Sequence, residues 1–212
     1  VNYSRSLHDA LPILAQIVSA LGVVYEPKSS NDRRREAQEF LESVKLNEEL
    51  PYWGYQLALR ENNGNNYIVR HFGLSLLQNS IFKKFHTFDK QKLVAVRQWI
   101  VELANKTVED DPNYLKEKIA YLWVTIAKKI WGAFLVKSSS NSKDSIVEES
   151  ATTSEEIEGW KSMDSDMWAL WNASLPGREL ALIIVRTLFE DLSLLADVVA
   201  SKKTPILNQS CV

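Results

Sequence analysis

Apolar residues recur every three or four positions along most of this 212-residue chain, which is the period of an amphipathic helix. The pattern is clearest over residues 33–46. There the apolar positions follow the spacing i, i+3, i+4 and i+7, at Ala37, Phe40, Leu41 and Val44. Asn31 or Asp32 precedes them as a candidate N-cap. The sequence therefore predicts a helix over 33–46 that begins at a side-chain cap.

The same period predicts further helices, and no stretch of the sequence reads as a convincing strand. Helices are expected over 12–25, 51–61, 67–85, 89–106, 114–135, 154–171 and 178–199. Gly22 is a candidate stop for the first of them. Pro51 suits the first turn of the next, and the turn NNGNN is expected to end it. The predicted fold class is therefore all-α.

Some of these helices are apolar on more than one side. In the helix of 67–85 two separate rows are apolar, Ile68, Phe72 and Leu76 in one and Val69, Gly73, Leu77 and Ile81 in the other. A helix of this kind has neighbours on two sides, and we pair it with the helix of 89–106. Antiparallel hairpins that each bury a face against the next form an α-solenoid. The irregular spacing favours HEAT-type repeats, because the TPR and ankyrin signatures are missing from the sequence.

Gly73 lies in the middle of the helix of 67–85, where a glycine costs about 1 kcal/mol relative to alanine. A residue without a side chain allows a neighbouring helix to approach closely. We therefore predict a close helix crossing at Gly73, with Tyr52, Trp53 and Tyr55 packed over it. The alternative is a glycine that the helix merely tolerates.

Composition changes along the chain and suggests its organisation. Residues 12–136 are expected to hold the first three hairpins. Residues 137–152 contain six serines and little that could be buried, so they are predicted to form a flexible loop. Residues 153–200 continue the helices, and residues 201–212 read as the tail of a fragment. Residues 1–11 are expected to be a non-native leader, because YSRSLHDALPI resembles a translated sequencing adapter.

Charge and cysteine content narrow the range of partners. The net charge is only −2, so the sequence as a whole does not attract nucleic acid or an anionic membrane. Cys211 is the only cysteine, which excludes a disulfide framework and a Cys-based zinc site within this chain. No apolar run has the roughly 18 residues of a membrane-spanning helix. We expect a reducing compartment, no membrane partner and no cofactor.

Enzymatic signatures are missing from the sequence. His8, His71 and His86 are far apart, and neither of the last two has a metal-ligand partner at i+4. His71 is expected at a helix surface or boundary. We find no P-loop, dinucleotide-binding turn or nucleophile elbow. The sequence therefore predicts a protein that is not an enzyme, with no catalytic or metal-binding residue.

Two stretches carry a family resemblance, RREAQEFLESVKLNEELPYWGYQLAL and YIVRHFGLSLLQNSIFKKF. They hold an Arg-x-x-Ala-x-x-x-Leu-like helix, a Trp, an apolar hairpin and a helix of the form hxRxxxxxxLxNxI, with matches at Arg34, Ala37, Leu41, Trp53, Arg70, Leu77 and Ile81. They resemble the amino-terminal domain of the karyopherin-β, or importin-β, superfamily. Within it, IVRHFGL, YLKEKIAYLWVTIAKKIWG and GRELALII are most similar to the exportin-5 branch, which includes fungal relatives.

The resemblance implies a nuclear transport receptor that shuttles between nucleus and cytoplasm. Such a receptor binds the small GTPase Ran in its GTP form, passes nucleoporins and carries cargo through the nuclear pore. In this family the amino-terminal repeats bind Ran, whereas much of the cargo surface lies in repeats outside this chain. The cargo class implied is structured RNA or phosphorylated protein, and the residues do not choose between them.

One row of residues is a candidate Ran-contact surface. On the helix of 89–106, a mixed apolar and amide row lies opposite the expected core face, at Val94, Gln98, Val101 and Asn105. The alternative is that its valines pack on an adjoining repeat. In the family the second helix of each early hairpin faces Ran, which adds Gln56 and Arg60 by position. Trp53, Arg70 and Gly73 are expected to be structural.

A different functional class also fits the composition. A HEAT-repeat scaffold or adaptor would have the same helices and no Ran binding. Direct RNA binding by this chain would need a basic stripe on the surface. The dependence of Ran binding on its nucleotide separates a transport receptor from a scaffold.

Overall fold

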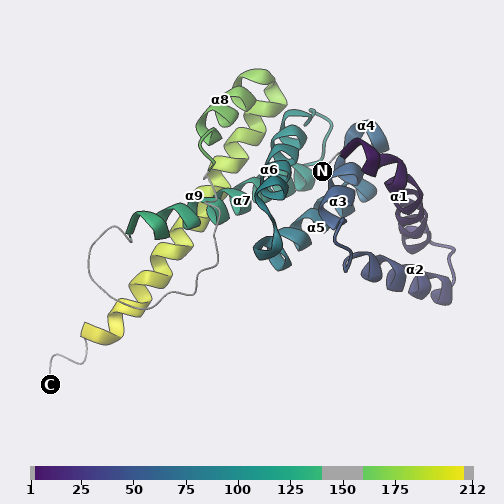
Figure 1. Ribbon diagram of the computed structural model, residues 1–212, viewed down its shortest axis with the longest axis horizontal. Helices are drawn as coiled ribbons and strands as arrows, with labels where there is room; N and C mark the ends of the chain where they lie inside the picture. Colours follow the sequence, from purple (N-terminus) through teal and green to yellow (C-terminus); the bar gives the residue numbers. More distant parts are fainter. Residues whose placement is uncertain (1–2, 140–159, 208–212) are drawn as a thin grey trace. The chain divides into compact units, whose positions relative to one another are not determined.

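The computed structural model describes the backbone of residues 3–139 and 160–207 and the side chains of residues 10–130 and 160–191. The chain divides into two compact units, Val1–Lys106 and Thr107–Val212. Every regular element in the described parts of the chain is a helix (Figure 1). The predicted all-α class, of the α-solenoid type, is confirmed.

Unit 1 holds most of the predicted hairpins. Its elements are α1 (Tyr3–Tyr25), α2 (Asn31–Val44), α3 (Leu50–Ala58), α4 (Arg60–Asn63), α5 (Tyr67–Lys83), the 3-10 helix η1 (Phe85–Thr87) and α6 (Lys90–Asn105). α1 packs against α2, and α3 packs along α5. The prediction that paired the helix of 67–85 with that of 89–106 is wrong, because α5 has its main contact with the preceding helix α3.

Side-chain caps set the starts of three helices in unit 1. The Ser30 hydroxyl accepts a hydrogen bond from a backbone N–H at the start of α2, so the N-cap is Ser30 and neither of the predicted residues, Asn31 and Asp32. Asn66 caps α5 in the same way, and Asp89 caps α6. Each cap satisfies a backbone donor that has no partner within its helix.

The helix predicted over 51–61 is broken in two. Leu59 has an extended backbone, with ψ at 130°, so α3 ends before it and α4 begins after it. The turn predicted after it is present, and Gly64 has the positive φ of 54° that favours glycine. Gly22 does not stop α1, which continues to Tyr25.

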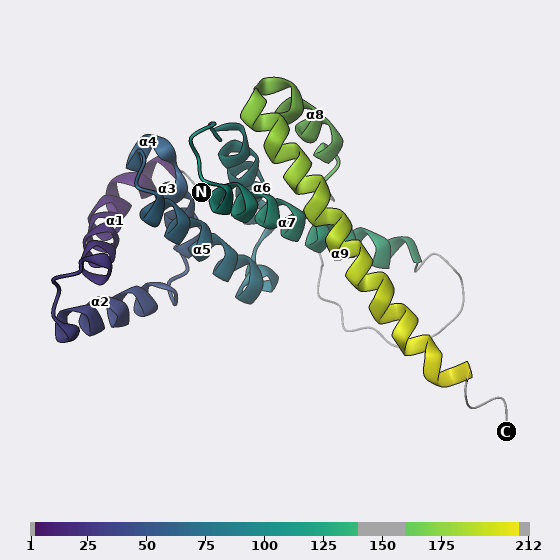
Figure 2. The ribbon, with the colours of Figure 1, turned by 180° about the vertical axis from the view of Figure 1, so that it is seen from behind.

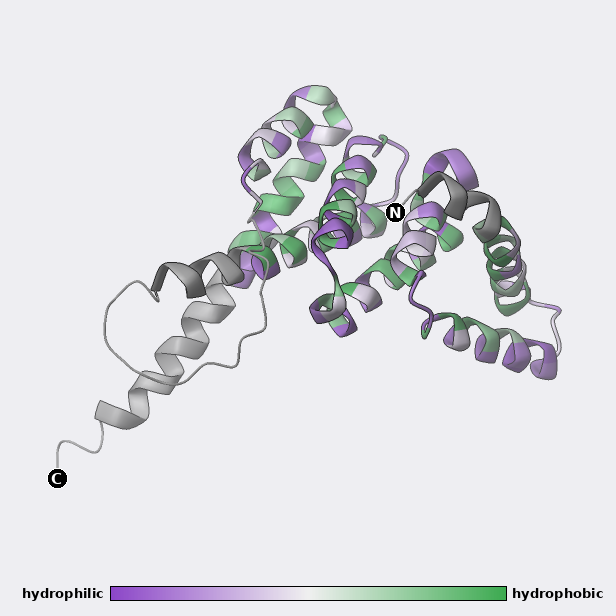
Figure 3. Ribbon diagram, in the orientation of Figure 1, coloured by the Kyte–Doolittle hydropathy of each residue, from purple (hydrophilic) through white to green (hydrophobic). Residues whose placement is uncertain are grey.

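The core of unit 1 joins the first hairpin to the second. Its buried side chains come from α1, α2, α3 and α5: Ile17, Leu21, Leu41, Val44, Leu50, Leu57, Val69 and Leu76. The predicted apolar spacing of α2 is visible as a hydrophobic stripe along one side of that helix, with hydrophilic residues on the other (Figure 3). The hydrophobic periodicity thus located the buried faces.

A pair of glycines marks the closest approach of α3 and α5. A Cβ atom built at Gly73 would lie 2.6 Å from the backbone oxygen of Gly54 and 2.6 Å from the backbone nitrogen of Ala58. A Cβ atom at Gly54 would lie 2.8 Å from the backbone oxygen of Gly73. The close crossing predicted at Gly73 is therefore present, but the atoms nearest to it belong to Gly54, Leu57 and Ala58. Of the aromatic residues expected there, Tyr52 and Tyr55 lie against Trp99, and Trp53 packs on the core of unit 1.

Unit 2 is built from α7 (Asn113–Ser139), α8 (Met163–Ala173) and α9 (Leu175–Leu207), and α9 packs against both of the others (Figure 2). Among the described side chains, ion pairs join α7 to α9: Lys116 with Glu179, Glu117 with Arg186, and Lys128 with Asp191. Trp160 lies against Trp123 of α7, with ring centroids 4.8 Å apart. Its indole N–H donates a hydrogen bond of 2.7 Å to Asp166 of α8.

Several predicted boundaries differ from those of the structure. Residues 137–139 belong to α7, and the rest of the predicted serine-rich loop lies outside the described residues. Residues 154–159 of the helix predicted over 154–171 lie outside the described residues, and α8 begins at Met163 after a turn at residues 161–162. α9 extends to Leu207, beyond the end predicted near residue 200. α1 begins within the predicted leader, whose origin the fold does not test.

Candidate functional site

The candidate contact row lies on α6, a helix whose opposite side is buried. The buried residues of that helix are Leu93, Ala95, Val96, Ile100, Leu103 and Ala104. On the other side, Gln98 and Asn105 are exposed, whereas Val94 and Val101 are half-buried. These four residues, called the α6 row below, are accessible, as a contact surface requires. Their role in binding stays a prediction.

Gln56 and Arg60, which were added to the row by position, take part in a different local arrangement. The side-chain oxygen of Gln56 accepts a hydrogen bond of 2.9 Å from Asn62. Gln56 also lines a groove of about 330 Å³ between α1 and α3, together with Asn63. Arg60 is half-buried at the start of α4. The structure therefore groups Gln56 with the turn after α3 and not with the α6 row.

Aromatic rings hold α6 against α3. Trp99 of α6 stacks on Tyr55, with ring centroids 5.1 Å apart and planes 12° from parallel. Tyr52 contacts the same indole at 5.9 Å in a tilted arrangement. Stacked and tilted aromatic pairs add about 0.5–1.5 kcal/mol beyond the area that they bury. The α6 row is thus carried by a helix whose orientation is fixed by its neighbour.

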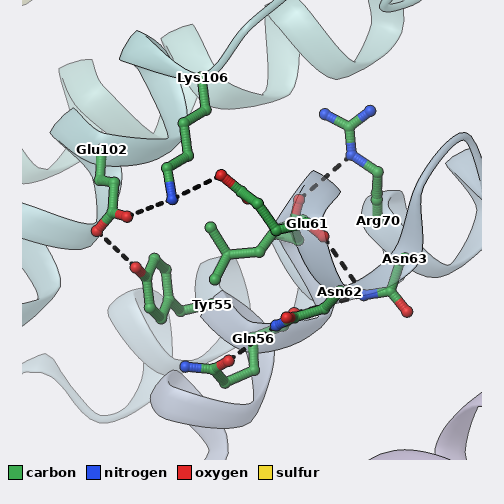
Figure 4. A network of polar contacts seen from close by, with 10 residues as sticks. Tyr55, Gln56, Glu61, Asn62, Asn63, Arg70, Glu102 and Lys106 are labelled. Atoms are coloured by element: carbon green, nitrogen blue, oxygen red, sulfur yellow. Dashed lines mark hydrogen bonds and ion pairs between the residues drawn. The ribbon is translucent and has the colours of Figure 1, made fainter.

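A chain of polar contacts continues from these rings and joins α3, α4 and α6 (Figure 4). The Tyr55 hydroxyl donates a hydrogen bond of 2.5 Å to Glu102. Lys106 lies 2.6 Å from the carboxylate of Glu102 and 2.9 Å from that of Glu61. One lysine therefore bridges two carboxylates from different helices. We call Tyr55, Glu61, Glu102 and Lys106 the polar network.

The pKa values of these groups show which interactions dominate. Burial and the bond to Glu102 raise the pKa of Tyr55 well above its usual value. Burial alone would raise the pKa of Glu102, but the bonds from Lys106 and Tyr55 outweigh burial and lower it. The bond from Lys106 also lowers the pKa of Glu61. Burial would lower the pKa of Lys106, and its two carboxylate partners raise it instead.

Lys106→Met should remove both ion pairs and keep most of the aliphatic stem. We expect the substitution to lower the free energy of unfolding by less than about 1 kcal/mol near neutral pH, because exposed ion pairs contribute little to stability. The lowered pKa values of Glu61 and Glu102 mean that this contribution is present above their usual value of 4.5 and is lost as the pH falls through the lowered pKa. Because the pKa of Lys106 is raised, the contribution is fully present below 10.5 and is lost as the pH rises through the raised pKa.

Urea unfolding at about pH 7 and about pH 3 measures this effect. The difference between Lys106→Met and the parent protein should be smaller at the lower pH. Lys90→Met, at the exposed first residue of α6, is the matched control and should show no such pH dependence. A difference that is the same at both pH values would mean that the stem of Lys106, and not its charge, stabilises the fold.

The residues expected to be structural occupy positions that fit this role. The Arg70 side chain is buried, and its Nε donates a hydrogen bond of 3.3 Å to the carbonyl of Ala58, the last residue of α3. Trp53 packs against the core of unit 1. His71 is half-buried on α5 and His86 is exposed, which agrees with the surface or boundary position predicted for His71.

Sequence reasoning missed the polar network and Trp99. Glu102 and Lys106 lie four positions apart in the sequence, and this helical spacing was a readable signal for an ion pair. Glu61 and Tyr55 carry no comparable signal, because their partners are more than 40 positions away in the sequence.

The described residues contain neither a metal cluster nor a spanning helix. No group of three or more His, Cys, Asp or Glu side chains in these parts of the chain is arranged to hold a metal ion. Within the same residues, every helix is too short or too polar to cross a bilayer.

The chain is similar in amino-acid sequence to parts of known proteins. No protein-family model matches the chain. Protein MSN5 of Saccharomyces cerevisiae is 44% identical over 198 residues, which is 93% of this chain and 15% of that protein. Exportin-5 of Dictyostelium discoideum is 28% identical over 58% of this chain and 11% of its own length. Exportin-5 of Homo sapiens is 30% identical over 55% of this chain and 10% of its own length.

The chain belongs to the karyopherin-β superfamily, in the branch of exportin-5 and its fungal relatives. The resemblance carried by the IVRHFGL stretch is thereby confirmed. This karyopherin-β chain spans only 10% to 15% of the length of the relatives named above.

Proposed function

We propose that this chain is the amino-terminal part of an exportin-5-like nuclear transport receptor that binds Ran-GTP and carries cargo through the nuclear pore. The observation that carries the proposal is the 44% identity to Protein MSN5 over 93% of the chain. The likeness to exportin-5 of Dictyostelium discoideum and Homo sapiens supports the same branch. The relatives are transport receptors, so no enzymatic activity is proposed.

The partners and location follow from the same proposal. The receptor would bind Ran in its GTP form, bind nucleoporins during passage through the pore, and shuttle between nucleus and cytoplasm. Cargo, either protein or structured RNA, would bind mainly to repeats outside this chain. Unit 1 would contribute the Ran contact, and the accessible α6 row on a firmly packed helix supports this placement.

A pull-down with two nucleotide states tests the Ran step. The immobilised protein is incubated with Ran loaded with GTP or with GDP, and the bound Ran is quantified. We expect clear preference for the GTP form. Equal recovery of the two forms, or recovery of neither, would favour the alternative of a HEAT-repeat scaffold without Ran function. Ran-GTP incubated with bare resin gives the background.

A further inference from the structure

Large apolar side chains are exposed on one side of α8 and along residues 182–189 of α9. Trp168 is 68% exposed, Leu182 is 58% exposed and Phe189 is 66% exposed. Trp171 and Val185 are exposed as well. Soluble proteins rarely expose a group of large apolar side chains together unless the group forms a contact site. We call these five residues the α8–α9 face.

Four of the five residues of the α8–α9 face line a groove. Trp168 and Trp171 from α8 line one hollow of about 290 Å³ together with Leu182 and Val185 from α9. The exposed residues of α9 follow the spacing i, i+3 and i+7. That spacing places them on a single side of the helix. The groove therefore has the form that receives another helix.

The remaining sides of α9 are already occupied. Its buried residues Leu180 and Ile184 lie within unit 2, where α9 packs against α7 and α8. The ion pairs of Glu179 and Arg186 fix another side of α9 against α7. The α8–α9 face is thus a second apolar side of α9, and a helix that is apolar on two sides has a neighbour on each of them.

We propose that the α8–α9 face is covered, in the longer protein, by a further amphipathic helix of the same polypeptide. Two observations select this occupant. The related Protein MSN5 is far longer, since the aligned residues make up only 15% of it. In an α-solenoid, each repeat buries its free apolar face against the next repeat.

The charges beside the groove agree with a protein helix as the occupant. Asp164 lines the groove, and Arg186 and Glu190 follow the apolar residues of α9. This mixture of signs suits the charged flanks of another amphipathic helix. An anionic membrane surface would instead be matched by a cluster of basic residues. The inference goes beyond the proposed function, because it does not depend on Ran or on cargo.

Hydroxyl-radical labelling read by mass spectrometry tests the inference. The labelling rates of Trp168 and Phe189 are compared between the 212-residue chain and a protein of the full length of its relatives. We expect severalfold slower labelling in the longer protein. Tyr25, which is 61% exposed on α1, is the internal reference and should label at the same rate in both proteins.

A charged substitution makes the test specific. In the longer protein, Leu182→Glu should restore fast labelling of Trp168, because a carboxylate opposes the docking of an apolar helix. Ala169→Glu, at an exposed position on another side of α8, is the matched control and should leave the labelling slow. If Leu182→Glu disrupts the longer protein as a whole, the comparison of the two unsubstituted proteins still decides the question.

Two results would overturn the proposal. Equally fast labelling of Trp168 in both proteins would show that the face stays open in the longer protein. Slow labelling already in the 212-residue chain, together with a dimer mass by light scattering, would assign the face to a second copy of the chain. Neither measurement involves Ran, so failure here is distinct from failure of the proposed function.

Discussion

Gly73→Leu is expected to lower the free energy of unfolding by about 3 kcal/mol or more, at or above the upper end of the usual cost of overpacking. At Gly73 even a Cβ atom would lie 2.6 Å from two backbone atoms of α3 and 2.8 Å from the Cβ of Leu57. Backbone atoms cannot turn aside as a flexible side chain can, so α3 and α5 would have to separate. The midpoint of urea unfolding, read by circular dichroism, measures the loss.

Gly22→Ala is the matched control for the Gly73 variant. Gly22 also lies inside a helix, but a Cβ atom built there would have no neighbour within 4 Å. Alanine should therefore stabilise the protein by up to about 1 kcal/mol, through helix propensity alone. Equal midpoints for Gly73→Leu and the parent protein would contradict the close crossing of α3 and α5.

The two glycines also show how far sequence reasoning could go. Gly73 could be singled out because a glycine in the middle of a helix lowers its stability. Its presence there therefore suggested a contact that compensates for the loss. Its partner Gly54 carried no such signal, since it lies close to Pro51 at the start of a short helix. Apolar spacing predicts which side of a helix is buried, but not which other helix covers it. For the same reason α5 was paired with α6, when its main neighbour is α3.

Helix ends could not be predicted accurately, because they depend on side-chain hydrogen bonds to the backbone that apolar spacing does not reveal. The break at Leu59 follows apolar residues that would suit a continuous helix, and the structure places the side chain of Asn63 against the carbonyl of Leu57 instead. The exposed positions of Gln98 and Asn105 follow from helix periodicity alone, whereas Val94 and Val101 of the same row are half-buried. The contacts that orient it, from Tyr55 to Trp99 and Glu102, depend on the tertiary fold.

The α6 row carries the prediction with the largest effect on function, and it rests on the proposed binding of Ran-GTP. Combining Gln98→Glu with Val101→Glu is expected to weaken that binding at least about tenfold, or about 1.4 kcal/mol. The reason is that an unpaired charge placed in an interface loses its hydration. Gln98→Lys with Val101→Glu should also weaken binding if burial matters more than the sign of the charge. Titration of labelled Ran-GTP measures the affinity.

A matched variant and a folding measurement make the result decisive. Gln38→Glu makes the same change at an exposed position of α2 and should leave the affinity unchanged. Circular dichroism reports whether the Gln98 and Val101 variants keep their helices. Full affinity with intact helices would show that the α6 row is not the contact surface, even in a chain of this family. Loss of helicity would instead place Val101 in the packing of the fold, because a carboxylate at a buried position destabilises the helix that carries it.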